Sequence, residues 1–305
     1  MALRHGLLMP SPSSPLACLA TSGVQIAIGP FLVRLRSDLS GVHEYLQRLY
    51  GDFHVAAGEG GHFDIAVVAS RGVRRWVRPQ ANLIVNGERP FLPLPGNLAG
   101  AGFEWSLNWC VGNQAPRWVA VHAAVVERGG RALILSAESG AGKSTLCAAL
   151  ALNGWRLFSD EFALIDPDTG LLTPLPRPIS LKNASIEITR ARGPNAVFGP
   201  QGVDIEGARF VHMKPPVESV RRAREEARPA WVVLPRWAAG RPTTLEPLPK
   251  AHALLRMTDQ SFNYNHLGTK GFACVADLVR QCDCYTLEYS DLDDVLIRLE
   301  SLASS

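Results

Sequence analysis

The sequence predicts an α/β protein in which a smaller α+β domain precedes a larger domain, and three observations support this prediction. Up to about residue 115, short runs of alternating apolar and polar residues surround one stretch with helical spacing. From about residue 116, short apolar runs alternate with amphipathic stretches. A glycine-rich turn lies between one of these apolar runs and the helix that follows it. A chain of 305 residues is long enough for two domains.

The first part of the chain divides into a tail and a domain. Prolines and serines interrupt the opening before a hydrophobic run of signal-peptide length can form, so we expect residues 1–22 to be a disordered tail. Residues 23–115 are expected to form the α+β domain, with strands at "VQIAIGPFLVRL" and "FDIAVVAS" and a helix at "LSGVHEYLQRLY". No cluster of titratable residues marks a catalytic site there, and its chemistry stays unassigned.

Residues 116–305 are expected to form the larger domain. Its first two strands, "WVAVHAAVVER" and "RALILSA", flank Gly129 and Gly130, a pair typical of a hairpin turn. The strand that carries His122 and the strand that leads into the glycine-rich turn are therefore expected to be antiparallel, which excludes an all-parallel sheet. The next stretch, "KSTLCAALALNG", predicts a helix ended by Gly154, and Trp155–Phe158 predicts another strand.

The remaining patterns predict further strands at "AWVVLPRW" and "CYTLEYS" and helices at "KAHALLRMTDQSF" and "GFACVADLVRQC". The last helix is expected to follow an N-cap at Ser290, with Asp293 three residues later as in a capping box. The proline-rich Leu172–Asn183 is too irregular for a helix and predicts an extended active-site or interface loop.

The glycine-rich turn, "SAESGAGKST" at residues 136–145, fits a phosphate-binding loop in which Ala137 stands where the first glycine usually stands. Backbone N–H groups and a helix N-terminus in such a loop point at one anion. Lys143 is expected to reach the β- and γ-phosphates of ATP, and the Ser144 hydroxyl to ligate Mg²⁺. The expected nucleotide-binding residues are Ala137, Glu138, Ser139, Gly140, Ala141, Gly142, Lys143, Ser144 and Thr145.

Two carboxylates follow the loop closely in sequence. Asp160 and Glu161 come seventeen and eighteen residues after Lys143, at the end of the predicted strand. Carboxylates near a bound nucleotide can hold the metal ion or accept the proton of an attacking hydroxyl. Together with the Ser144 hydroxyl, Asp160 and Glu161 are therefore the residues expected to hold the metal. The LSGGQ-like signature of transport ATPases and the N-K-x-D of GTPases are both absent from the sequence, so neither class is favoured.

The order of His122, "SGAGKST" and "GWRLFSDEFALID" resembles the catalytic core of bacterial HPr kinase/phosphorylases. With "PRPISLKN" and "FNY…LG" added, the layout resembles more closely the HPr kinase-related proteins of the HPr-related kinase A type, from about Gly23 to Leu302. This resemblance implies an HPr kinase and phosphoenolpyruvate carboxykinase-like P-loop kinase domain. Its motifs are most specific over residues 118–185. The signature E-[IV]-R-G-L-G-[IV], tied in that family to phosphorolysis, has no counterpart in this sequence.

The resemblance also implies roles for single residues. Asp160 takes the proton from an acceptor serine hydroxyl, His122 lies beside it, and Glu161 lies near the metal. In "PRPISLKN", Arg177 and Lys182 are candidates to neutralise the γ-phosphate or to hold the acceptor. An exposed, solvated loop explains the presence of these two cations nearly as well.

Composition excludes several other classes. Lys plus Arg (31) exceed Asp plus Glu (28) only slightly, and the basic residues are scattered, so nucleic acid is not an expected partner. No apolar run reaches the length of a membrane span. Six cysteines without a C-x-x-C pair suit a reduced cytoplasm, and Cys282 and Cys284 are expected to be ordinary buried thiols.

These observations predict a cytoplasmic, ATP- and Mg²⁺-dependent kinase that acts on a serine of a protein or peptide. The resemblance makes an HPr-like protein or a small precursor peptide the expected acceptor, and implies a homo-oligomer. Two alternatives stay open. One is a small-molecule kinase or a phosphoenolpyruvate carboxykinase-like enzyme, and the other is a nucleotide-gated binding protein that transfers nothing.

Overall fold

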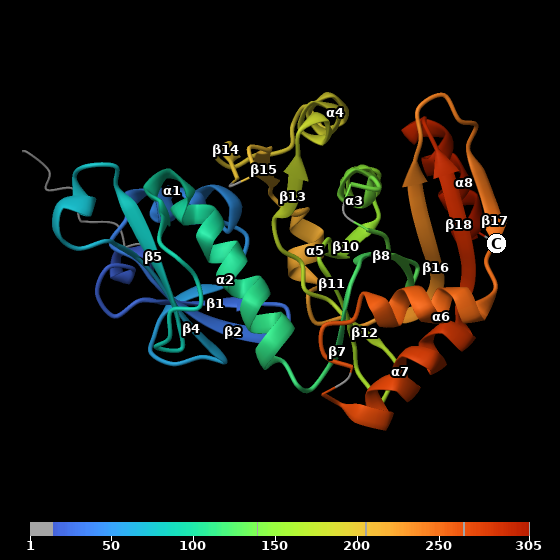
Figure 1. Ribbon diagram of the computed structural model, residues 1–305, viewed down its shortest axis with the longest axis horizontal. Helices are drawn as coiled ribbons and strands as arrows, with labels where there is room; N and C mark the ends of the chain where they lie inside the picture. The colour runs from blue at the N-terminus through green and yellow to red at the C-terminus, as the bar shows by residue number, and fades with distance from the viewer. Residues whose placement is uncertain (1–14, 139, 205, 265, 305) are drawn as a thin grey trace, which may run out of the picture.

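The N-terminal part of the chain forms a mixed sheet covered by two helices (Figure 1). The computed structural model describes residues 15–138, 140–204, 206–264 and 266–304. Within this sheet the strands lie in the order β3-β1-β2-β4-β5-β6. Their bounds are Val24–Ile28 (β1), Phe31–Arg36 (β2), Val55–Ala57 (β3), Phe63–Ala69 (β4), Gln80–Val85 (β5) and Leu94–Pro95 (β6).

The helix predicted in this region is found as α1, Ser40–Leu49. It buries Val42, Tyr45, Leu46 and Leu49, which the helical repeat places on one face. Strands β1 and β2 bury every second residue, as the strand repeat requires when one face is covered. Helix α2, Ala99–Gln114, is buried on most of its surface because it lies between this sheet and the rest of the chain (Figure 1).

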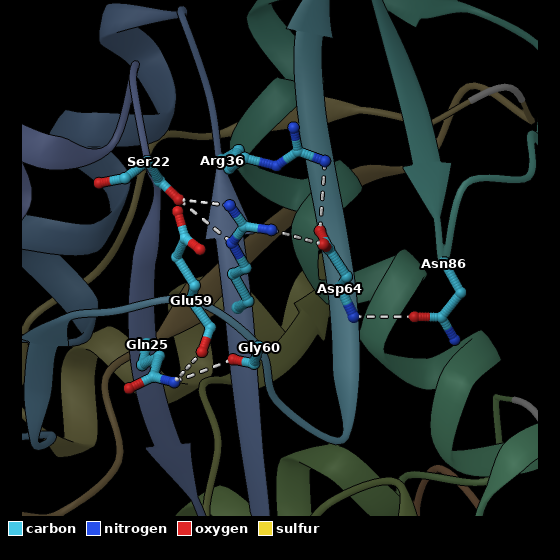
Figure 2. Close-up of polar contacts among 8 residues, drawn as sticks. Ser22, Gln25, Arg36, Glu59, Gly60, Asp64 and Asn86 are labelled. Atoms are coloured by element: carbon cyan, nitrogen blue, oxygen red, sulfur yellow. Dashed lines mark hydrogen bonds and ion pairs between the residues drawn. The ribbon is translucent and has the colours of Figure 1, made fainter.

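The expected disordered tail, residues 1–22, is ordered over its last part. Residues 1–14 lie outside the described residues, whereas Pro15–Cys18 form a 3-10 helix (η1) and Leu19 is buried. The Ser22 carbonyl oxygen accepts two hydrogen bonds from Arg34 on β2, at 3.1 and 2.7 Å (Figure 2). Arg34 and Arg36 both reach Asp64 on the neighbouring strand β4, at 3.0 and 3.4 Å. Residues 15–22 of the expected tail therefore pack with the N-terminal sheet.

A second, larger sheet contains the glycine-rich turn. Its strands lie in the order β10-β8-β9-β16-β18-β17. Strands β9, β16 and β18 are parallel neighbours, and the other pairs are antiparallel. The bounds are Ala124–Arg128 (β8), Arg131–Leu135 (β9), Arg156–Ser159 (β10), Arg228–Trp237 (β16), Thr244–Pro247 (β17) and Asp283–Tyr289 (β18).

Helices cover both faces of this sheet, so its strands are apolar on both sides. One face packs on α3 (Lys143–Leu152) and α8 (Leu292–Ser304) through residues such as Leu133 and Leu135. The opposite face packs on α6 (Lys250–Asp259) and α7 (Gly268–Gln281) through residues such as Ile134. The result is a mixed α/β arrangement, as the sequence predicts.

The predicted hairpin is found between β8 and β9, but the strand before it is not continuous. Residues predicted as one strand are broken at Ala123, so that β7 (Val119–His122) and β8 belong to different sheets. Strands β8 and β9 are antiparallel and the sheet is not all-parallel, as expected, but the expectation that the hairpin strand carries His122 is wrong, because His122 lies on β7. Strand β7 instead pairs antiparallel with β11 (Phe162–Ile165), and β11 pairs with β12 (Leu172–Thr173).

The proline-rich segment Leu172–Asn183 is extended, as predicted, but it is largely buried rather than an open loop. It contributes β13 (Ile179–Lys182), which pairs with β15 (Arg209–Met213), and β15 pairs with β14 (Gly202–Val203). Two short helices complete this region, α4 (Ala184–Arg192) and α5 (Val217–Arg221).

The predicted capping box at the last helix is also wrong. The Asp291 carboxylate caps α8, accepting from the Asp293 N–H at 2.7 Å. The Ser290 hydroxyl instead donates to the Arg241 carbonyl at 2.7 Å. A carboxylate at a helix N-terminus gains from the helix dipole as well as from the hydrogen bond, which explains the choice of cap.

The two parts of the chain share a hydrophobic core across residue 115. One cluster contains Phe103 and Leu107 of α2 together with Phe162, Leu164 and Leu175. Of the cysteines, all free, Cys282 and Cys284 are buried, as predicted. Within the described part of the chain, every helix is too short or too polar to cross a bilayer.

Candidate functional site

The glycine-rich turn leads from β9 into α3, as the sequence predicts. Gly140 and Gly142 have φ angles of +85° and +92°, left-handed conformations that glycine adopts without strain. Ala137 is not among the residues with positive φ, so alanine fits where the first glycine usually stands. Gly142 is the N-cap of α3, and Lys143 is the first helical residue. The end of the turn therefore lies at the start of a helix, where the dipole favours an anion.

Lys143 is buried although it carries an amine. Its Nζ lies 2.6 Å from Nε2 of His122. Burial lowers the pKa of Lys143, and the nearby Glu161 and Asp160 oppose this effect. With the amine as donor, Nε2 is the acceptor and the imidazole proton lies on Nδ1. The loop cation and the predicted histidine therefore meet directly.

His122 connects this cation to a carboxylate. Its Nδ1 lies 3.4 Å from Oε1 of Glu161. Burial would raise the pKa of Glu161, but His122, Arg177 and Lys143 outweigh it, so that its pKa is lowered. Glu161 is consequently ionised at neutral pH.

Two strand connections that run side by side bring these residues together. The chain passes from β7 to β8 through Ala123, and from β10 to β11 through Asp160 and Glu161. The Ala123 N–H donates to the Glu161 carbonyl at 3.2 Å. His122 is paired with Phe162 in the register of β7 and β11. The break at Ala123 that the sequence did not predict is therefore the feature that places His122 beside the acidic pair.

Asp160 is the carboxyl of this cluster whose pKa is raised. Only 5 % of the residue is exposed. Burial, followed by the like charge of Glu161, raises the pKa of Asp160 to about 7, against the Ser180 N–H and the two cations Arg177 and Lys143. The Ser180 N–H donates to Oδ2 at 2.8 Å. Adjacent carboxyls with separated pKa values are the pattern of an acid–base pair, with Asp160 protonatable near pH 7 and Glu161 ionised.

Arg177, a predicted ligand of the γ-phosphate or the acceptor, is held elsewhere. Its guanidinium is buried and lies 3.4 Å from Oε2 of Glu104 on α2. It also donates to the Asn108 side chain. Oε1 of Glu104 accepts from the hydroxyls of Tyr50 and Tyr45, at 2.7 and 3.3 Å. Arg177 acts on the acidic pair through its charge, which lowers the pKa of Asp160 and of Glu161.

The other predicted residues are more exposed. Ser144 and Thr145 are half-buried on the first turn of α3. Glu138 is exposed and lies 3.3 Å from Arg256 of α6. Lys182 is exposed and binds Asp204 at 3.0 Å. Ser139 lies outside the described residues.

Residues 260–263 are a part of the site that sequence reasoning missed. This segment lines β7, since the His122 N–H donates to the Gln260 carbonyl at 2.8 Å. The Asn263 side chain accepts from the Ala120 N–H and donates to the Trp118 carbonyl, both at 2.9 Å. The exposed ring of Phe262 lies edge-on to His122, with centroids 6.0 Å apart. Only the motif "FNY" pointed to this segment, and its spacing assigned no role.

The donor set fits a hard divalent cation. Among the described residues, no group of three or more His, Cys, Asp and Glu side chains is arranged to hold a metal ion alone. Mg²⁺ needs no such group, because it keeps waters and takes phosphate oxygens together with one or two carboxylates. The hydroxyl of Ser144 and the carboxylates of Asp160 and Glu161 offer oxygen ligands only. The negative charge of Glu161 helps to raise the pKa of Asp160, and a bound cation would reduce this repulsion between the two carboxylates.

Comparisons with known proteins add no family assignment. A scan against protein-family models found no match, and a search of curated proteins found no similar sequence. The functional argument therefore depends on the residues of the site.

Proposed function

We propose that this chain is an ATP- and Mg²⁺-dependent kinase that transfers the γ-phosphate to a serine of a protein or peptide. The observation that carries the proposal is the meeting of Lys143, His122 and the Asp160–Glu161 pair at the start of α3. One end of this cluster belongs to a phosphate-binding sequence, and the other offers a carboxyl with a pKa of about 7. The sequence resemblance of residues 118–185 to HPr kinase-related proteins also supports it.

In the proposed reaction, Asp160 is the general base. The serine Oγ attacks the γ-phosphorus, its proton moves to the Asp160 carboxylate, and the bond from the γ-phosphorus to the bridging oxygen of ADP breaks. Because Ser180 occupies Oδ2, we assign the proton to Oδ1. A base with a pKa near the working pH combines a useful ionised fraction with a useful proton affinity.

Lys143 and His122 position the charges around this step. Lys143 donates to the β- and γ-phosphates, where negative charge is spread during transfer. His122 holds the amine of Lys143 at Nε2 and faces Glu161 with Nδ1. When bound, Mg²⁺ would supply further neutralisation of the phosphates, and the residues that would hold it in this mechanism are Ser144 and Glu161, which leaves Oδ1 of Asp160 free for the proton.

Phosphate transfer from γ-labelled ATP tests the proposal. The wild type is incubated with labelled ATP, Mg²⁺ and lysate of the source cell. Label on serine of a discrete polypeptide is the expected result. Label on a small molecule would replace the protein kinase by a small-molecule kinase. Tight ATP binding without any labelled product would favour a binding protein.

Two variants separate binding from transfer. Asp160→Asn should keep ATP affinity while single-turnover transfer falls by about 10²–10⁴-fold, because the proton acceptor is lost. Lys143→Ala should weaken both, because the cation on the phosphates is lost. Asp168→Asn, which changes an exposed carboxylate paired with Lys270, is the matched control and should behave like the wild type. Transfer by Asp160→Asn at the wild-type rate would show that Asp160 is not the base.

A further inference from the structure

Trp237 is an exposed aromatic residue fixed at the rim of the glycine-rich turn. It is the last residue of β16, the parallel neighbour of the strand that leads into the turn. Its backbone N–H donates to the Ala141 carbonyl at 3.2 Å. A Cβ atom built on Gly142 would lie 3.4 Å from the Trp237 Cβ. The residue is nevertheless 53 % exposed. The turn and the indole are therefore held together, with much of the indole open to solvent.

The order of the strands sets the direction in which a bound nucleotide extends. Strand β9 lies between β8 and β16. On the β8 side, the chain leads to His122, Asp160 and Glu161, toward which the γ-phosphate must point for transfer. The ribose and base would then leave the turn in another direction, and the β16 side offers the exposed Trp237 at its end.

Other aromatic residues do not meet these conditions. Exposed large aromatic side chains in the described part of the chain are Trp76, Trp237, Phe262 and Phe272. Phe262 lies against His122, on the proposed catalytic side of the turn, whereas Trp76 belongs to the N-terminal part of the chain and Phe272 to α7. Tyr289, opposite Trp237 in the strand register, is buried, and its hydroxyl is directed to the Gly142 carbonyl at 3.4 Å.

We propose that the indole of Trp237 is the platform on which the purine base of the nucleotide stacks. The proposal rests on the proposed binding of ATP and adds the residue that recognises its base. A base has two apolar faces that gain from stacking on an aromatic ring, and this contact is independent of the phosphates. Trp237 is thus a binding residue for the base, whereas Lys143 binds the phosphates.

The experiment compares ATP with inorganic tripolyphosphate, which has the phosphates and lacks the base. Both are titrated with Mg²⁺ into the full-length wild type and into Trp237→Ala and Trp237→Phe. We expect Trp237→Ala to weaken ATP binding about ten-fold or more, and to leave tripolyphosphate binding within about two-fold of the wild type. Trp237→Phe, which keeps an aromatic face, should retain most of the ATP affinity. Trp76→Ala is the matched control, since Trp76 is 80 % exposed and belongs to the N-terminal part of the chain.

The outcomes separate this inference from the proposed function. Unchanged ATP affinity in Trp237→Ala would overturn the stacking role. Equal weakening of ATP and tripolyphosphate would also overturn it, because it would assign the indole to support of the turn. If the wild type binds neither compound, the proposed function itself fails and the stacking role with it. Quenching of wild-type tryptophan fluorescence by ATP but not by tripolyphosphate, and its loss in Trp237→Ala, would support the inference independently.

Discussion

The buried ion pair between Arg177 and Glu104 should be a main support of the contact between α2 and the segment that carries β13. Both side chains are only 5 % exposed. Replacement of Arg177 by Met keeps the length and the apolar stem but leaves the Glu104 carboxylate without its cation. Breaking a buried pair from one side typically costs about 3–5 kcal/mol. We expect Arg177→Met to lower the free energy of unfolding by about 3 kcal/mol at pH 8, the low end of this range. Tyr50 and Tyr45 still donate to Glu104 in the variant, and Nε of Arg177 has no hydrogen-bond partner to lose.

The loss should depend on pH with a defined sign. Burial raises the pKa of Glu104 from 4.5, and Arg177 is the largest of the effects that lower it. Without Arg177, the pKa of Glu104 in the folded state rises further. At a pH between the two pKa values, Glu104 is protonated in the folded variant and ionised in the unfolded chain. Protonation of Glu104 then stabilises the folded variant, and this stabilisation is lost as the pH rises through the raised pKa. The deficit against the wild type should therefore be smaller at pH 5.5 than at pH 8.

Urea unfolding of the wild type and of Arg177→Met at both pH values measures this difference. A shift of the urea midpoint with an unchanged dependence of the unfolding free energy on urea concentration reports the change in stability. The double variant Glu104→Gln/Arg177→Met should recover part of the loss at pH 8, because it removes the unpaired charge. A deficit equal at both pH values, or no rescue by the double variant, would refute the assignment of the loss to an uncompensated carboxylate.

Two further predictions concern the turn and a buried histidine. Gly142→Ala should lower stability by about 1–3 kcal/mol and weaken tripolyphosphate binding, because φ is +92° and the new Cβ would clash with the Tyr289 hydroxyl oxygen. Calorimetry measures the loss of stability and titration the loss of tripolyphosphate affinity. The control is Gly129→Ala, where φ is also positive but no atom lies within 4 Å of the new Cβ, and equal losses in the two variants would contradict the steric reason. Burial, followed by the charge of Arg177, lowers the pKa of His212 from 6.5 to about 4. Between these pH values the unfolded chain binds a proton at His212 that the folded chain does not, so the free energy of unfolding should decrease as the pH is lowered. His212→Phe, which keeps a ring against Tyr45 and Phe210, should remove about 1.4 kcal/mol of this decline for each pH unit in that window, and parallel stability curves for the two proteins would contradict it.

Local features of this chain could be predicted from the sequence because their causes are local. The helical spacing in α1, the alternation in β1 and β2, and Gly129-Gly130 between β8 and β9 each act over a few residues. The glycines at 140 and 142 take the left-handed conformations for which glycine is suited, and α3 begins at Lys143. The residue types Lys143, Asp160 and Glu161 pointed to the site for the same reason.

What only the tertiary structure decided depends on contacts between residues far apart in sequence. The break at Ala123 follows from the pairing of β7 with β11 and of β8 with β10, which no pattern in residues 118–128 encodes. Arg177 pairs with Glu104 rather than facing solvent or phosphate, because both are buried when α2 packs against the proline-rich segment and neither charge can be left unpaired. The pKa of Asp160 has the same origin, since burial and the neighbouring charges that set it exist only after the strands have assembled.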